Sequence, residues 1–205
     1  ALSGLVEIHE NSVDGFDSIM NMGGDTGFDK SDFLAKLRYT SGVHELTFKM
    51  LDIDETSNQT YVGLTQASFE NNPRKRYGMS FYDVMNNDGE QTSFAYVGDY
   101  EAFTLTATMW SNDYHRDWFK VDKANNTKAH GVEDGIDEVI AAANAGDANA
   151  QAILDGDLAV TVKLKHNNRF YTNEGMQFNL SKEIGNNAIT FGYRDMEDSE
   201  SRLQS

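Results

Sequence analysis

DFLAKLRYTSGVHELTFKM, residues 32–50, is the stretch that decides the fold class. On both sides of the Ser41-Gly42 pair, every second side chain is apolar. The apolar positions are Phe33, Ala35, Leu37 and Tyr39 before the pair, and Leu46, Phe48 and Met50 after it. A period of two is typical of a β-strand with two different faces. Since Ser41-Gly42 is a turn signal, the stretch predicts an antiparallel hairpin with a tight connection.

The same pattern returns along the rest of the chain. Alternating segments occupy residues 91–96 and 103–110 around a link near residue 99, and residues 176–181 and 189–194 around a turn near residue 186. An opening strand is predicted over residues 2–9. Together these segments predict an all-β chain of about seven strands, arranged as an antiparallel up-and-down meander.

The predicted connections differ greatly in length. Three are tight turns near residues 41, 99 and 186, and three are long loops over residues 10–31, 54–90 and 113–168. Tight turns at one end and long loops at the other are typical of an outer-membrane barrel. A soluble β-sandwich that presents loops to carbohydrate or another ligand is the alternative, and a self-associating sheet is a third possibility. One long loop should contain a small helical segment, over residues 134–145 and 148–154.

The composition narrows the classes of function. The chain has 17 Lys and Arg residues against 33 Asp and Glu, so its formal net charge of −16 argues against a nucleic-acid partner. There is no cysteine, which excludes thiolate metal sites and cysteine nucleophiles. The sequence contains no apolar run long enough for a transmembrane helix and no signal-peptide pattern. Barrel strands alternate in polarity, so a mean hydropathy of −0.58 is compatible with a membrane barrel.

Several blocks of sequence resemble one family. Four blocks can be distinguished: Gly15-Phe16 with Gly23–Lys30 and Asp32; Glu55–Phe69 followed by Asn72–Tyr77; Thr104–Lys123; and Asn167–Gln177. In order and with fitting spacing, they are similar to segments of TonB-dependent outer-membrane receptors of the ferric-citrate type. The resemblance covers nearly the whole chain.

The resemblance implies a receptor that imports a ferric chelate through a barrel of 22 strands with an internal plug. Capture outside the cell would be followed by plug movement driven by TonB. The plug and the TonB box precede the barrel in that family, so we expect residues 1–205 to be a fragment of the barrel wall. The implied location is the outer membrane of a Gram-negative bacterium. The implied partners are outer-membrane lipid, the ferric chelate and, in the full receptor, TonB, whose contact lies outside this segment.

Seven strands cannot close as bacterial single-chain barrels do, because those barrels have an even number of strands. The predicted sheet therefore has two open edges, each able to pair with another strand. On the sheet itself, we expect two different faces. Apolar residues should share one face: Leu46, Phe48, Leu105, Phe178 and Phe191. Polar residues should share the other: Lys36, Thr47, Thr106, Gln177 and Arg194.

Arg74, Lys75 and Arg76 form the one compact basic patch. Arginine presents forked donors that match carboxylates, so these residues are candidate contacts for an anionic ferric chelate. Salt bridges within the loop, or contact with lipopolysaccharide phosphates, are the alternatives.

Aromatic residues near the predicted strand ends are candidates for membrane-interface girdles. Tyr39 and Phe103 would lie at the turn end of the sheet. The others would lie toward the loop end: Trp110, Phe170, Tyr171 and Tyr193. Packing in a core is the alternative for each of them.

No catalytic or cofactor motif is present, so an enzyme is not expected. The five histidines are scattered, and no pair has the spacing of a zinc-binding helix. Two acidic clusters, Asp52–Glu55 and Asp195–Glu200, lack the spacing of a calcium loop and are interpreted as solvated acidic rims. We therefore predict no catalytic residue, no metal site and no cofactor.

Overall fold

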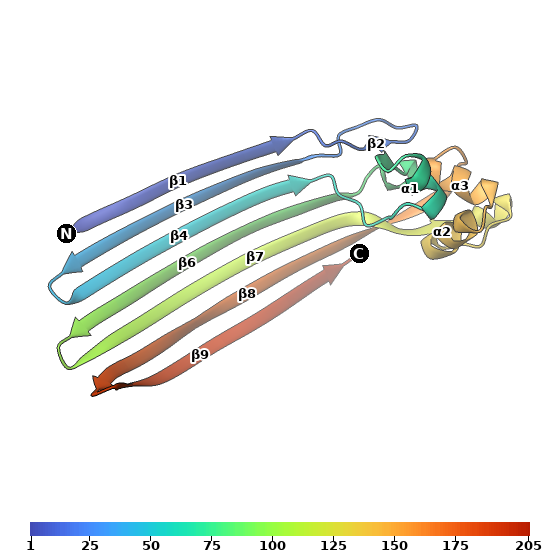
Figure 1. Cartoon of the computed structure of the whole chain (residues 1–205). Helices are drawn as coiled ribbons and strands as arrows, with labels where there is room; N and C mark the ends of the chain where they lie inside the picture. The colour runs from blue at the N-terminus through green and yellow to red at the C-terminus, as the bar shows by residue number, and fades with distance from the viewer.

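The computed structural model describes all residues from Ala1 to Ser205. One seven-stranded sheet runs through the molecule, and a group of small helices lies at one end of it (Figure 1). The strands are β1 (Leu2–Val13), β3 (Phe28–Ser41), β4 (His44–Ser57), β6 (Val84–Tyr100), β7 (Phe103–Asn125), β8 (Thr161–Ile184) and β9 (Asn187–Gln204). Their order in the sheet is the order in the chain, and every neighbouring pair is antiparallel. The predicted seven-stranded meander is confirmed, and no barrel is closed.

The architecture of the alternative interpretation, a β-sandwich, is not observed. A sandwich needs two sheets packed face to face. The second sheet in this chain contains only β2 (Ser18–Ile19) and β5 (Lys75–Arg76), which pair in parallel within the loop region. Both faces of the large sheet are therefore left without a covering layer over most of their length.

The three tight turns are confirmed. Two of them use glycine in the left-handed region, Gly42 with φ 57° and Gly185 with φ 62°, where a side chain would be strained. The third connects Tyr100 to Phe103 through two residues. All three turns lie at the end of the sheet opposite the helices (Figure 1).

The strands are longer than the sequence pattern indicated, and the long loops are correspondingly shorter. The loops occupy residues 14–27, 58–83 and 126–160, while β7 has 23 residues and β8 has 24. Pairing continues where both faces of a strand carry polar side chains, because backbone hydrogen bonds do not need an amphipathic pattern. The register between β7 and β8 shifts only between Val121 and Lys123.

The register gives the sheet two different faces, as predicted. Directly paired residues share a face. One face carries the predicted apolar residues, Leu46, Phe48, Leu105, Phe178 and Phe191, and we name it the banded face. The same face also carries Leu37, Phe94, Met109 and Met176. The polar face carries the polar set: Lys36, Thr47, Thr106, Gln177 and Arg194.

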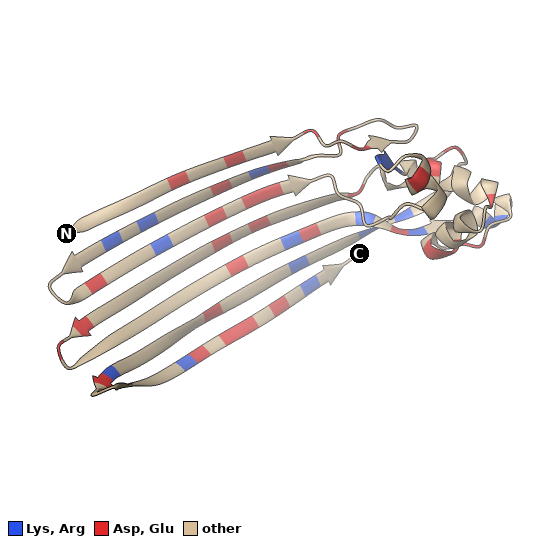
Figure 2. Cartoon of the chain, viewed as in Figure 1, with Lys and Arg blue, Asp and Glu red and all other residues tan.

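The banded face changes character along the strands. Its apolar residues lie in the half nearer the hairpin turns. Farther along the same face, Asp52, Glu90 and Asp113 are direct cross-strand partners, and Asp54 pairs with Asp88 in the next row. Acidic residues accordingly recur along the strands in Figure 2. An apolar band is thus bordered by an acidic belt on the side toward the helices.

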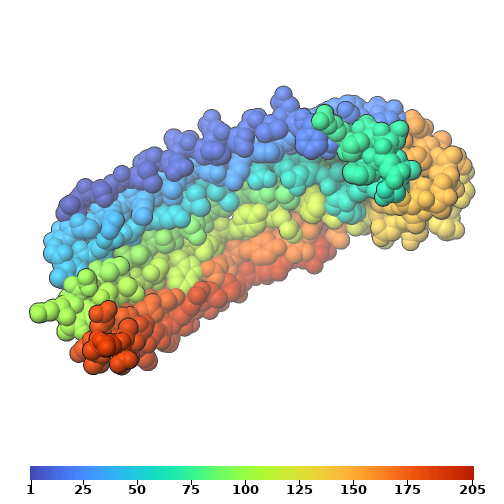
Figure 3. All heavy atoms as spheres, viewed as in Figure 1, coloured from blue at the N-terminus to red at the C-terminus, as the bar shows by residue number.

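The hydrophobic core lies in a cap at the helical end of the sheet, which Figure 3 shows as a lobe. The cap consists of residues 58–83 and 126–160. Its helices are α1 (Gln66–Asn71), η1 (Gly78–Ser80), η2 (Thr127–His130), α2 (Ile136–Asn144) and α3 (Ala148–Asp155). The predicted helical segment is confirmed as α2 and α3. The side chain of Asp147 begins α3 by accepting hydrogen bonds from the backbone N–H groups of Asn149 and Ala150.

The apolar side chains of the cap pack against the ends of β7 and β8. Val139, Ile153 and Leu154 are fully or almost fully buried, together with Val121 of β7. Outside this cluster the chain has little core, since only 26 of its 205 residues are buried. No helix of the chain has the length and apolar character that would let it cross a membrane.

Candidate functional site

Arg76, one of the predicted ligand contacts, is buried in the cap. Only 4% of the residue is exposed. Its guanidinium donates hydrogen bonds to the backbone oxygens of Asn58, Ser80 and Asp83, and to Ser80 Oγ. Because its donors face protein acceptors, Arg76 braces the loop through backbone oxygens and a hydroxyl, and not through the salt bridge that was the alternative from the sequence. The prediction that it contacts a ligand is not supported.

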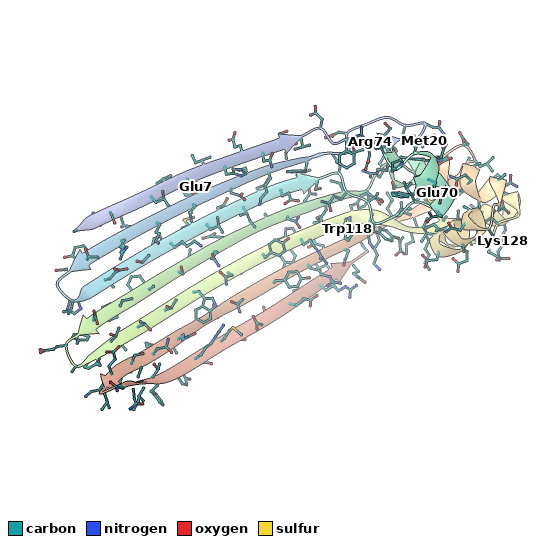
Figure 4. All side chains as sticks on the ribbon, in the orientation of Figure 1. Glu7, Met20, Glu70, Arg74, Trp118 and Lys128 are labelled. Atoms are coloured by element: carbon teal, nitrogen blue, oxygen red, sulfur yellow. The ribbon has the colours of Figure 1, made fainter.

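The other two residues of the basic patch have different surroundings. Lys75 forms a half-buried ion pair with Asp155 of α3, with 2.7 Å between Nζ and Oδ1. Arg74 is exposed on the cap (Figure 4), and its guanidinium makes no hydrogen bond or ion pair within the chain. Of the three predicted residues, Arg74 alone has a guanidinium free to meet a ligand.

Asp83 is the buried carboxylate beside Arg76. It accepts hydrogen bonds from the Thr60 hydroxyl and from the Val121 N–H, both at 2.7 Å. Burial raises the pKa of Asp83, although these hydrogen bonds and the charge of Arg76 act in the opposite direction. Burial also lowers the pKa of Arg76. This pair joins the loop 58–83 to β7 and is structural.

A row of three arginines crosses the polar face just below the cap. Arg116 of β7 is the direct partner of Arg169 of β8, which is the direct partner of Arg202 of β9. We name this set the arginine row. Like charges placed directly opposite one another destabilise a sheet. In a chain with a net charge of −16, such a row is a concentration of positive charge that requires a compensating anion or acid.

The protein supplies little of that compensation. Arg169 lies 3.3 Å from a carboxylate oxygen of Glu200 and donates to the Tyr171 hydroxyl at 3.3 Å. Arg116 and Arg202 have no carboxylate within ion-pair distance. The row therefore keeps positive charge that no acid of the chain neutralises directly.

Unsatisfied donors lie next to the arginine row. The Nε of Arg116 and the Nε1 of Trp118 are buried and have no hydrogen-bond partner in the protein. Lys120 holds its ammonium 3.6 Å from the ring centre of Tyr61 and 4.9 Å from that of Trp118. Buried polar groups normally have partners, so these donors indicate a place where an oxygen-rich anion can accept hydrogen bonds.

The sequence did not reveal the arginine row, because Arg116, Arg169 and Arg202 lie on three different strands. One signal was available: Arg169 and Arg202 are equidistant from the turn at residues 185–186, and residues equidistant from a tight turn pair in a hairpin. Arg116 could not be placed in the same way, since loop 126–160 separates β7 from β8 and hides their register.

The predicted girdle aromatics divide between the two faces. Tyr39, Phe103, Phe170 and Tyr193 lie on the banded face, whereas Trp110 and Tyr171 lie on the polar face. The Trp110 indole donates to Asn173 Oδ1 at 2.7 Å, and the Arg194 guanidinium lies 5.1 Å from a ring centre of Trp110. Trp110 and Tyr171 are therefore excluded from a girdle on the banded face, because successive residues of a strand point to opposite sides.

The aromatics of the banded face lie at different levels along the strands. Tyr39 and Tyr193 belong to the same cross-strand row, within the apolar band, although the sequence placed Tyr193 toward the loops. Phe170 lies within the acidic belt, in the same cross-strand row as Asp54 and Asp88, and stacks on His115 with ring centres 4.2 Å apart. Four aromatic residues were predicted to lie toward the loop end of the strands. Of these, Phe170 alone lies both on the banded face and at the helical end of the sheet.

No group of three or more His, Asp or Glu side chains is arranged to hold a metal ion. The acidic belt has carboxylates on neighbouring strands, but they do not converge on one point. His115 bonds to Asp88 and Asn168, and His166 bonds to Asp117, so both histidines are used within the sheet.

Comparisons with protein-family models, with curated proteins and with solved structures found no match to this chain. The family resemblance therefore depends on the sequence blocks quoted above.

Proposed function

We propose that this chain is a segment of the wall of an outer-membrane β-barrel of the TonB-dependent receptor type, and that its polar face contacts an anionic ferric chelate. The observation that carries the proposal is the difference between the two faces of the sheet. One face has an apolar band with nothing over it, and the other carries the arginine row.

The composition of the apolar band suits lipid. On β3 it contains Ala35, Leu37 and Tyr39, and the next residue on that face, Phe33, pairs directly with Asp52 of the acidic belt. On β4 and β9 the apolar positions end at Asp52 and Asp195. The lipid-facing side of an outer-membrane barrel is likewise an apolar band of limited height. The acidic belt would then begin where the hydrocarbon ends.

The chain exposes more surface than a compact protein of its size. Its accessible area is 12558 Å², whereas a compact monomer of this mass exposes about 9,600 Å². The excess includes large apolar side chains of the banded face, such as Phe191, which is 73% exposed. Contiguous apolar patches of this extent mark contact with a membrane or another protein.

The polar face supplies the proposed ligand contact. A ferric chelate with several carboxylates offers paired oxygens, and guanidinium groups bind such oxygens through two parallel hydrogen bonds. The Arg116 Nε and the Trp118 indole N–H have no hydrogen-bond partner within the chain. The chelate would lie against the arginine row below the cap, and free Arg74 would act as an outer contact. Transport through the membrane would need TonB and a plug, as the family resemblance implies.

The orientation of the wall can be tested with spin labels, because the chain has no cysteine. Single-cysteine variants Phe48→Cys and Thr47→Cys place a nitroxide on adjacent residues of β4 that point to opposite faces. In lipid vesicles, we expect the label at position 48 to collide with oxygen dissolved in the lipid. The label at position 47 should collide instead with a water-soluble nickel complex.

Extending the scan through residues 44–57 should show accessibility that alternates with a period of two and reaches more water beyond Asp52. Equal accessibility of both reagents at positions 47 and 48 would contradict the proposal that the banded face meets lipid.

A further inference from the structure

Asn87 of β6 is a buried polar residue whose side-chain oxygen has no partner. Only 8% of the residue is exposed, and its Oδ1 accepts no hydrogen bond within the chain. Buried polar side chains nearly always have a hydrogen-bond partner. A buried acceptor that the chain leaves unsatisfied therefore indicates a group from outside the chain that donates to it.

Asn87 belongs to the same cross-strand row as the three arginines. Across the sheet, this row reads Glu55, Asn87, Arg116, Arg169 and Arg202, each residue being the direct partner of the next. The Cβ atoms of directly opposite residues are about 4.5–5.5 Å apart. Asn87 is thus at the border between one carboxylate and three guanidinium groups on the polar face.

A donor without a partner accompanies this acceptor. The Nε–H of Arg116 is buried and makes no hydrogen bond in the chain, so it does not donate to Asn87 although the two residues are direct partners. One hydroxyl group can satisfy both, because its oxygen accepts from the guanidinium and its hydrogen is donated to the amide oxygen. A carboxylate alone cannot, since an ionised carboxylate only accepts hydrogen bonds.

The charges of the row determine the direction in which an anionic ligand lies. Glu55, on the far side of Asn87, has no cation within ion-pair distance. A ligand carboxylate near Glu55 would meet a like charge, whereas over the arginine row it meets opposite charges. The ligand therefore directs its carboxylates toward β8 and β9 and a neutral donor toward β6. The indole N–H of Trp118, where the sheet meets the cap (Figure 4), is a further donor without a partner.

We propose that the arginine row selects an anionic ligand with a free hydroxyl beside its carboxylates, and that Asn87 determines this specificity. The hydroxyl bridges Arg116 Nε and Asn87 Oδ1, while the carboxylates bind the guanidinium groups. Because the arginine row is the ligand site of the proposed function, this assignment rests on that function. In a ferric chelate, the selected hydroxyl is one that the iron leaves free. A chelate whose hydroxyls are all bound to iron leaves Asn87 without a donor.

Hydrogen phosphate also combines an O–H group with negative oxygens, but its size suits the row less well. Neighbouring strands are about 5 Å apart, so the row extends about 10 Å from Arg116 to Arg202. Carboxylates on separate carbon atoms can reach more than one guanidinium group along this length. The row therefore favours a hydroxylated carboxylate over a single phosphate.

Malate and succinate form a matched pair of probes, since they have the same charge and chain length and malate alone has a hydroxyl. Fluorescence of Trp118, in a background where Trp110 is replaced by Phe, measures binding to the chain in micelles. We expect malate to bind about three- to tenfold more tightly than succinate, which corresponds to one added hydrogen bond. Equal dissociation constants, or no binding of malate, would overturn the proposal, and so would tighter binding of inorganic phosphate than of malate.

A substitution at position 87 tests the residue itself. Asn87→Leu removes the acceptor and keeps a side chain of similar shape, so malate should lose its advantage over succinate. Asn179→Leu is the matched control, because Asn179 lies on the same face near the turns, and the preference for malate should persist. A preference that survives Asn87→Leu, or one that Asn179→Leu also abolishes, would overturn the proposal.

The outcomes distinguish selection by the hydroxyl from the proposed function. If labelled ferric citrate binds the chain and is displaced equally well by malate and by succinate, the proposed function stands and the selection by Asn87 is overturned. If the chain prefers malate through Asn87 but does not bind a ferric chelate, the selection stands and the proposed function is contradicted.

Discussion

Asp83 is the carboxylate on which the buried hydrogen bonds of the cap converge. It accepts from Thr60 and Val121, and its backbone oxygen accepts from Arg76. Removing an acceptor leaves buried donors without partners, which costs about 1–3 kcal/mol for each donor. An amide in place of the carboxylate keeps an acceptor oxygen and removes the buried charge.

We therefore expect Asp83→Ala to destabilise the cap by about 1–3 kcal/mol or more, and Asp83→Asn to cost less. Fluorescence of Trp118 during thermal unfolding, in a background where Trp110 is replaced by Phe, measures the cap. If Asp83→Asn and Asp83→Ala were equally unstable, the acceptor oxygen would not be the feature that matters.

The same residue predicts a dependence on pH. Burial raises the pKa of Asp83 in the folded chain above its ordinary value of 3.8. A raised pKa means that the folded state holds the proton more tightly than the unfolded state does. The contribution of Asp83 to stability is therefore fully present below about pH 3.8 and is lost as the pH rises through the folded pKa. Asp83→Asn should remove this component from the pH profile of cap unfolding, and an identical profile in both proteins would contradict the assignment.

Arg116 is the residue at which the proposed ligand contact can be tested by a single substitution. Arg116→Gln should weaken binding of ferric citrate to the chain in micelles by about tenfold or more, because a charge-assisted hydrogen bond contributes about 1.5–3 kcal/mol. Arg38→Gln is the control, since Arg38 lies on the same face near the turns and pairs with Glu45. Equilibrium binding of labelled ferric citrate gives the two dissociation constants. Equal effects of the two substitutions would indicate a general response to charge and would remove the arginine row from the site.

Helices α2 and α3 hold the cap on the sheet by burying apolar side chains. Leu154→Ala should destabilise the cap by about 2–5 kcal/mol, because Leu154 is fully buried and the cavity would not close. Leu203→Ala is the matched control, since Leu203 of β9 is exposed and should change stability by less than about 0.5 kcal/mol. Hydrogen exchange of cap amides in micelles measures both variants. Similar values for the two leucines would show that the cap does not depend on this core.

Two adjacent residues of strand β4 allow a matched test of which face of the sheet meets lipid. Phe48→Arg places a charge in the apolar band and should cost about 2–4 kcal/mol in lipid, whereas Thr47→Arg places the same charge on the polar face and should cost far less. Unfolding in lipid vesicles compares the two. If both substitutions were tolerated equally, the banded face would not be the face that meets hydrocarbon.

The whole molecule is a sheet with an uncovered apolar band and a compact cap at one end. Acidic residues recur along the strands (Figure 2), while the arginine row lies under the cap on the polar face. The core of the cap is shared with the ends of β7 and β8, and the band needs a cover of lipid, detergent or protein.

We expect the chain to form large assemblies when detergent is diluted away, because the apolar band then meets water. The control variant replaces Phe48, Phe94 and Phe178 by Thr, the residue type that dominates the polar face of β7, and should form smaller assemblies. Light scattering during dilution measures the size. A parent chain that stays small in buffer would show that the band is not an associating surface.

By itself, the sequence determined the class of fold, the seven-stranded meander, the three tight turns and the two faces. These features depend on local patterns: a period of two selects strands, glycine at a positive φ selects a turn, and a turn pairs the residues on either side of it. The helical segment was also local, because its apolar stripe and the capping Asp147 lie close together in the chain.

The tertiary structure decided the rest. The full length of the strands, the burial of Arg76 beside Asp83 and the arginine row all depend on pairing across long loops or on packing in the cap. A loop of many residues hides the register of the strands that it connects, and a charged side chain shows nothing in sequence of the acceptors that will surround it. The proposed ligand contacts therefore keep Arg74 of the basic patch and add the arginine row, whose members Arg116, Arg169 and Arg202 only the sheet brings together.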